Sequence, residues 1–142
     1  MKTIRYLSLA LATTFASLAA ADKPSPLSAD QKAFLADYES VRAALAADDL
    51  TAANKAAAQL AKSQKTATPA AQKIASASKL DTAREAFKAL SKEAVSMAKG
   101  QPGFFQANCP MVPNGEGNWV QTTRKINNPY FGKSMLTCGT IE

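Results

Sequence analysis

Four sulfur-bearing side chains near the C-terminus are the residues of this sequence best suited to chemistry. Cys109 and Met111 flank Pro110, whose ring fixes one backbone angle and limits how the chain turns between them. Met135 and Cys138 have i, i+3 spacing, which places both sulfurs on one side of a helical turn. If the C-terminal segment folds back on itself, the four sulfur atoms converge.

Two kinds of site are compatible with these four residues. Thiolates and thioethers are soft ligands that favour Cu(I), whereas Zn²⁺ prefers thiolate or imidazole. A disulfide between Cys109 and Cys138 would instead close a loop of about 30 residues and stabilise the fold by roughly 3 kcal/mol. Met111 and Met135 would then be ordinary core residues. Spacing alone favours the disulfide, because paired cysteines are usually oxidised outside the cytoplasm.

The absence of histidine from all 142 residues narrows the possible functions. It excludes His-based nucleophile activation, His general-base chemistry and imidazole metal ligands. No base partner for Cys109 is visible, and the two cysteines do not form a Cys-x-x-Cys redox motif. We therefore do not expect an enzyme. The net charge of +6 is spread along the chain without a basic and aromatic cluster, so nucleic-acid binding has little support.

The first 21 residues have the pattern of a cleavable export signal. Lys2 and Arg5 precede an uncharged, leucine-rich stretch, and three alanines at 19–21 precede Asp22. The apolar stretch is shorter than the roughly 20 residues that a transmembrane helix needs, and no later stretch qualifies. An N-terminal anchor that is never cut is the alternative. We expect an exported, periplasmic mature chain, residues 22–142, that forms a single domain without a membrane span.

Residues 28–99 have the periodicity of α-helices. Ser28 and Gln31 fit a capping box, and Asp49 is placed to cap a second helix over Leu50–Ser63. A third helix is expected over 69–79, followed by or continuous with a fourth from near Asp81. The expected apolar stripes are Phe34, Tyr38, Val41 and Leu45 in the first helix and Ala83, Phe87, Leu90, Ala94 and Met97 in the fourth. We predict a mainly α fold, an antiparallel three- or four-helix bundle that acts as scaffold.

Composition changes sharply at residue 100. Residues 100–142 hold all six glycines, four of the seven prolines and the single tryptophan, Trp119. Short apolar runs at 104–105 and 119–120 are separated by a turn at 113–115. We predict a small irregular or β lobe that carries the Cys/Met motifs, with Trp119 as its core anchor.

Four sequence blocks of this lobe resemble the domain of unknown function 3347 family. The blocks are NCPM (108–111), GNWVQ (117–121), INNPYFG (126–132) and MLTCG (135–139). Weaker similarity extends into the helical segment, at Tyr38, Ala43 to Leu45, Asp48, Asp49, Ala83 to Phe87, Leu90 and Ser91. The resembled family consists of small exported bacterial domains, some of them fused to periplasmic adaptor subunits of heavy-metal efflux pumps.

The resemblance implies a soft-metal function and moves the balance from the disulfide to metal binding. Cys109, Met111, Met135 and Cys138 fall on the Cys-Pro-Met and Met-Leu-x-Cys-Gly blocks, which implies a copper(I) site at these four residues. The implied function is a metal chaperone or an accessory to heavy-metal efflux, with an efflux component or a metal donor or acceptor protein as partner. Expected supporting residues are Pro110, Trp119, Asn128, Pro129, Tyr130, Phe131, Gly132 and Gly139. A non-catalytic interaction domain with a Cys109–Cys138 disulfide remains the alternative.

Overall fold

A computed structural model describes residues 24–63 and 69–142. The predicted export signal at 1–21 lies outside these residues. The described chain is mainly helical and has a small antiparallel sheet near the C-terminus, as the sequence predicts. No helix within the described ranges combines the length and apolarity needed to cross a bilayer.

The first helix, α1 (Ala29–Ala46), begins at the predicted capping box. The Gln31 backbone N–H donates to Ser28 Oγ at 3.2 Å, and the Ser28 N–H donates to Gln31 Oε1 at 2.9 Å. These two bonds satisfy donors that the first turn would otherwise leave unpaired. The predicted apolar stripe is buried at Phe34, Tyr38, Val41 and Leu45.

The next three helices are α2 (Leu50–Ser63), α3 (Pro69–Ala75) and α4 (Leu80–Ala98). The α2 bounds match the prediction, and the Asp49 carboxylate accepts a hydrogen bond from the first turn. The third helix is shorter than predicted and does not continue into α4. Lys79 is extended, with φ −140°, so the helical path is interrupted before α4 begins.

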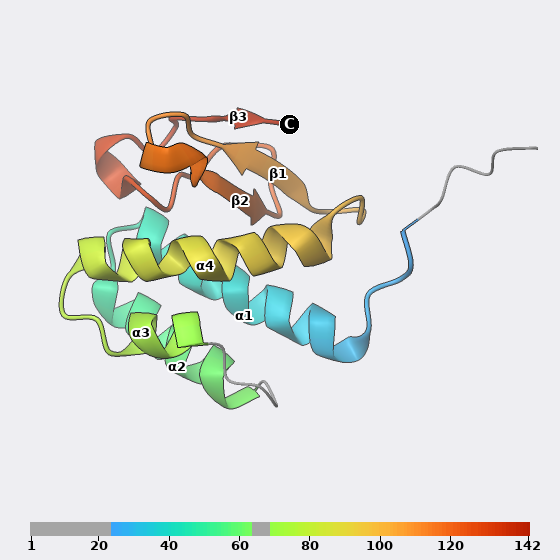
Figure 1. Ribbon diagram of the computed structural model, residues 1–142, viewed down its shortest axis with the longest axis horizontal. Helices are drawn as coiled ribbons and strands as arrows, with labels where there is room; N and C mark the ends of the chain where they lie inside the picture. The colour runs from blue at the N-terminus through green and yellow to red at the C-terminus, as the bar shows by residue number, and fades with distance from the viewer. Residues whose placement is uncertain (1–23, 64–68) are drawn as a thin grey trace, which may run out of the picture.

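The lobe, which we define as residues 100–142, contains a three-stranded antiparallel sheet of order β2-β1-β3. Its strands are β1 (Phe105–Asn108), β2 (Asn118–Gln121) and β3 (Thr140–Ile141). Two short 3₁₀ turns, η1 (Pro113–Gly115) and η2 (Gly132–Ser134), lie in the connections. Figure 1 shows this lobe on one side of α1 and α4, with α2 and α3 on the other side.

One continuous core joins the helices to the lobe. Tyr38 stacks on Phe87 with ring centroids 5.4 Å apart, and Phe87 meets Tyr130 edge-on at 5.7 Å. Tyr130 in turn meets Trp119 at 6.1 Å. Trp119 is fully buried, which confirms its predicted position as a core anchor. Because these rings come from α1, α4 and the lobe, the two parts cannot separate without exposing aromatic surface.

Candidate functional site

The sheet brings the two cysteines together. Cys109 follows β1 directly and Cys138 lies two residues before β3, and these strands pair with Asn108 opposite Thr140. The two Sγ atoms lie 2.9 Å apart, although the residues are separated by 29 positions in the chain. Cys109 is buried, whereas Cys138 is half-buried. We call these two side chains the thiol pair.

Each cysteine belongs to a tight backbone turn. In the Cys109 turn (109–112), the Val112 N–H donates to the Cys109 carbonyl at 3.2 Å. Pro110 occupies the second position of this turn, where its fixed φ is favourable. In the Cys138 turn (135–138), the Cys138 N–H donates to the Met135 carbonyl at 3.0 Å. The first and last residues of such a four-residue turn have Cα atoms within about 7 Å, so the backbone of Met135 lies near that of Cys138.

The two methionines are placed less favourably than the sequence predicts. The i, i+3 spacing brings two side chains to one side only on a helical turn, but Met135 has φ −146° and ψ 51°, because the preceding 3₁₀ turn has already ended. Met135 is half-buried, and Met111 is 61 % exposed at the tip of the Cys109 turn. The structure therefore brings together the two thiols and leaves Met111 open to solvent.

In the part of the chain that the structure describes, no acidic side chain adds a metal ligand to the thiol pair. Among the described residues, no group of three or more Cys, His, Asp or Glu side chains is placed to hold a metal ion. The ligands that the structure brings together are therefore two soft thiols, and Met111 and Met135 belong to the turns that carry them. This donor set fits Cu(I) and does not fit a hard cation.

Two glycines permit the close approach of backbone around the thiol pair. The Cys109 N–H donates to the Gly117 carbonyl at 3.0 Å, and a Cβ on Gly117 would lie 2.1 Å from the Cys109 carbonyl oxygen. Gly139 has φ +132°, and a Cβ there would approach the Trp119 ring to 2.9 Å. Larger residues at either position would displace a cysteine-bearing segment.

Asn128 holds the Cys138 segment from the other side. Its Nδ2 donates to the Cys138 carbonyl at 2.9 Å, and its backbone N–H donates to the Leu136 carbonyl at 2.8 Å. Its Oδ1 accepts the N–H groups of Tyr130 at 2.8 Å and Phe131 at 3.3 Å. Asn128 is fully buried, so these bonds satisfy a side chain that would otherwise be costly to bury.

The remaining supporting residues adjoin Asn128. Pro129 and Tyr130 are buried, and Phe131 packs against the core while half-buried. The Gly132 N–H donates to the Asn128 carbonyl at 3.1 Å and opens the 3₁₀ turn that leads to Met135. The INNPYFG block thus forms a bend that delivers the chain to the Cys138 turn.

The contact with Cys109 affects the ionisation of the Cys138 thiol. The hydrogen bond with Cys109 raises the pKa of the Cys138 thiol above its ordinary value, and desolvation acts in the same direction. Cys138 is consequently protonated at neutral pH in this arrangement. A metal that binds as a thiolate complex must therefore displace this proton, so uptake should release protons and weaken as pH falls.

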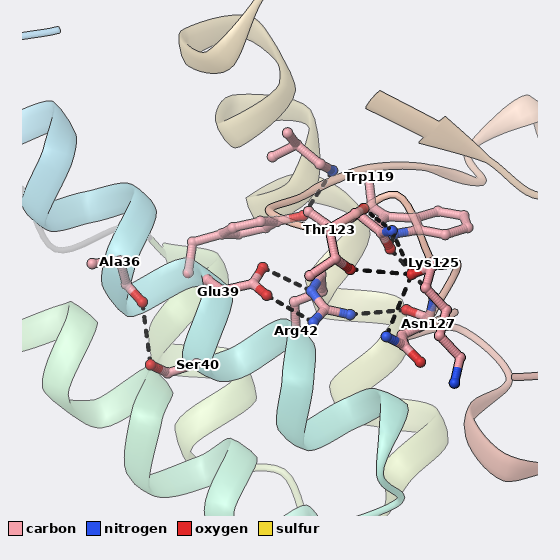
Figure 2. Close-up of polar contacts among 11 residues, drawn as sticks. Ala36, Glu39, Ser40, Arg42, Trp119, Thr123, Lys125 and Asn127 are labelled. Atoms are coloured by element: carbon pink, nitrogen blue, oxygen red, sulfur yellow. Dashed lines mark hydrogen bonds and ion pairs between the residues drawn. The ribbon is translucent and has the colours of Figure 1, made fainter. Parts of the chain in front are cut away.

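Two arginines, buried Arg42 and half-buried Arg84, connect the helices to the lobe. Figure 2 shows Arg42 of α1 between the Glu39 carboxylate and the backbone of Asn127. Arg42 Nη1 donates to the Asn127 carbonyl at 2.9 Å. Arg84 of α4 donates through Nε to the Pro129 carbonyl at 3.0 Å. Neither arginine is among the site residues predicted from the sequence, although Arg84 lies in the weaker part of the family resemblance.

Asp48 forms an ion pair with Arg84, and the titration of its carboxyl group gives a testable prediction. Arg84 Nη2 lies 2.5 Å from Asp48 Oδ1, and this hydrogen bond holds the pKa of Asp48 below its ordinary value. A carboxyl group whose pKa is lowered by folding stabilises the fold at pH values above its ordinary pKa. This stability is lost as pH falls through the pKa of the folded state. Asn is a suitable replacement because it tolerates the left-handed backbone, φ 60°, at this position.

We expect Asp48→Asn to lower the free energy of unfolding at neutral pH by about 1–2 kcal/mol. The decline in stability towards about pH 3 should be smaller than in the wild type, since the titrating carboxylate is gone. Urea denaturation at a series of pH values measures both effects. Asp37→Asn, which replaces a carboxylate that accepts a hydrogen bond from Ser63, is the matched control. An unchanged pH profile in Asp48→Asn would refute the role of this ion pair.

Comparison with known proteins found no relative of this chain. No family model, no curated protein and no solved structure matches the chain. The resemblance to the domain of unknown function 3347 family, drawn from the four C-terminal blocks, therefore stays a prediction.

Proposed function

We propose that this chain is an exported, periplasmic protein that binds a soft metal, copper(I), through the thiol pair. The observation that carries the proposal is the 2.9 Å separation of the Cys109 and Cys138 sulfurs in a lobe whose two cysteine turns also carry methionine. In this proposal half-buried Met135 is the resident thioether ligand, and exposed Met111 serves as a ligand during metal exchange. In this proposal the four helices form an antiparallel bundle that acts as scaffold.

Binding of one metal ion by both thiolates requires the thiol pair to open. With metal–sulfur bonds of about 2.3 Å, two thiolates on one metal lie roughly 3.8–4.6 Å apart, depending on the S–metal–S angle. The sulfurs must therefore move apart by about 1–2 Å on binding. Cys138 is the half-buried partner and follows the exposed Thr137, so its turn is the segment that moves.

The proposed biological role is metal delivery. A periplasmic Cu(I) chaperone or efflux accessory must bind the ion tightly and still release it to a partner. A half-buried Cys138 and an exposed Met111 leave one side of the site open for exchange with a metal donor, an acceptor protein or an efflux component. The family resemblance, with its link to heavy-metal efflux adaptors, points in the same direction.

A structural disulfide is the second candidate, and the same distance favours it. The sulfurs need to approach by only about 0.9 Å to reach the bond length of a disulfide. The cross-link would stabilise the loop-rich lobe by roughly 3 kcal/mol. The chain would then be a non-catalytic interaction domain, with no metal as cofactor.

Native mass spectrometry of the reduced protein tests the proposal. Titrated with Cu(I) in the absence of oxygen, the protein should gain one copper ion per chain and lose protons as the thiols ionise. Protein whose thiols have been alkylated is the matched control and should remain copper-free. Absence of copper uptake by the reduced protein would overturn the metal proposal. Thiol counting on protein taken directly from the periplasm then decides whether the disulfide is the native form.

A further inference from the structure

Two cations on one face of α4 reach the two cysteine-bearing segments separately. Arg84 and Lys88 are four residues apart and so lie one above the other on the helix surface. A cleft of about 210 Å³ between α4 and the lobe is lined by Arg84, Lys88, Val112 and Phe131, among others. On the lobe side, the cleft is lined by Val112 of the Cys109 turn and by Phe131 of the bend that leads to the Cys138 turn.

Lys88 contacts the Cys109 side. Its Nζ lies 3.1 Å from the Glu116 carboxylate, and Glu116 directly precedes Gly117, whose carbonyl accepts the Cys109 N–H at 3.0 Å. Hydrogen bonds to Glu85 and then Glu116 raise the pKa of Lys88, so its charge is retained across the neutral range. The Lys88 side chain is only 16 % exposed, which limits its screening by solvent.

Arg84 contacts the Cys138 side. It donates to the Pro129 carbonyl at 3.0 Å, and the neighbouring residue, Asn128, donates its side-chain N–H to the Cys138 carbonyl at 2.9 Å. Arg84 is itself fixed by Asp48 and by the Leu45 carbonyl at 3.0 Å. Its planar guanidinium can make all three contacts at once, which a lysine cannot do.

We infer that Arg84 and Lys88 are positioning residues that set the separation of the two thiols, one for each cysteine-bearing segment. Neither residue contacts a sulfur in the hydrogen bonds and ion pairs described above, so each acts through one neighbouring segment. This role deepens the proposed function, because it takes the thiol pair as the working site. Under this inference, the two sulfurs are kept close together by contacts from α4 as well as by the fold of the lobe.

Thiol–disulfide exchange with glutathione measures this positioning without any metal. The protein dithiol transfers two hydrogen atoms to oxidised glutathione, so that one protein S–S bond forms and two glutathione thiols are released. We expect Arg84→Lys and Lys88→Gln each to lower the equilibrium constant of this reaction by roughly three- to tenfold, because loosened thiols meet less often in bonding geometry. Lys88→Arg keeps the ion pair with Glu116 and should restore the wild-type constant.

A core variant away from the cysteines separates positioning from general destabilisation. Ile74→Val shortens a buried side chain of α3 and should lower stability while leaving the exchange constant unchanged. Equal constants for the wild type, Arg84→Lys and Lys88→Gln would overturn the inference, as would an equal shift in Ile74→Val. Failure of copper uptake by the wild type would refute the metal proposal alone, since the exchange reaction requires only the thiols.

Discussion

Replacement of Cys109 by serine should abolish high-affinity copper(I) uptake. Serine is nearly the same size, so the buried position and the Cys109 turn are kept, but its hydroxyl is neither soft nor ionised at neutral pH. We expect the apparent affinity for Cu(I) to fall on the order of 100-fold or more, because a single thiolate remains. Competition against a chromogenic Cu(I) chelator, under reducing and oxygen-free conditions, measures this change.

The methionines provide graded controls for the same titration. Met135→Leu and Met111→Leu remove the thioethers of the two cysteine turns and should each weaken binding by about tenfold or less. Met97 is a half-buried thioether of α4, outside the lobe, and Met97→Leu should leave the affinity unchanged. Trp119 fluorescence reports that each variant is folded, since this is the only tryptophan in the chain. Wild-type affinity in Cys109→Ser would refute the proposed site.

Phe87→Ala should be among the most destabilising substitutions in this chain. Phe87 is fully buried and lies between Tyr38 of α1 and Tyr130 of the lobe, with ring centroids 5.4 Å and 5.7 Å away. Removal of the ring leaves a cavity and breaks both aromatic contacts, which should cost about 3–5 kcal/mol. Such a loss is a large part of the 5–15 kcal/mol by which domains are typically stable.

Urea denaturation followed by both far-UV circular dichroism and Trp119 fluorescence measures this loss. The two signals should shift together, because the same ring supports the helices and the lobe. Phe105→Ala is the matched control, since Phe105 is half-buried and its ring is covered by the Arg124 guanidinium at 4.7 Å. That change should cost about 1 kcal/mol or less. A similarly small effect for Phe87→Ala would contradict the proposed linkage of helices and lobe.

Local features of the fold follow from the sequence because they depend on near neighbours. The Ser28 capping box, the Asp49 cap and the bounds of α2 each rest on residues within one helical turn, and all are found in the structure. The sequence is compatible both with a break between the third and fourth helices and with one continuous helix. In the structure α3 ends at Ala75, and Lys79 is extended before α4 begins.

The methionine geometry shows where local spacing fails. An i, i+3 interval brings two side chains to one side only if the backbone is helical. The 3₁₀ turn ends at Ser134, and the β-turn that follows places Met135 and Cys138 by a different geometry. Likewise, Pro110 limits the shape of the Cys109 turn, but the exposure of Met111 depends on which surface the lobe presents to the helices.

By itself, the sequence determined the mainly helical character of residues 28–99, the change of composition at residue 100 and the soft-sulfur chemistry of the lobe. Side-chain type and local periodicity suffice for these features. Only the tertiary structure decided that Cys109 and Cys138 lie 2.9 Å apart and that Arg84 and Lys88 contact the segments beside them. These contacts join residues far apart in the chain, and they form only when strand pairing and helix packing bring those segments together.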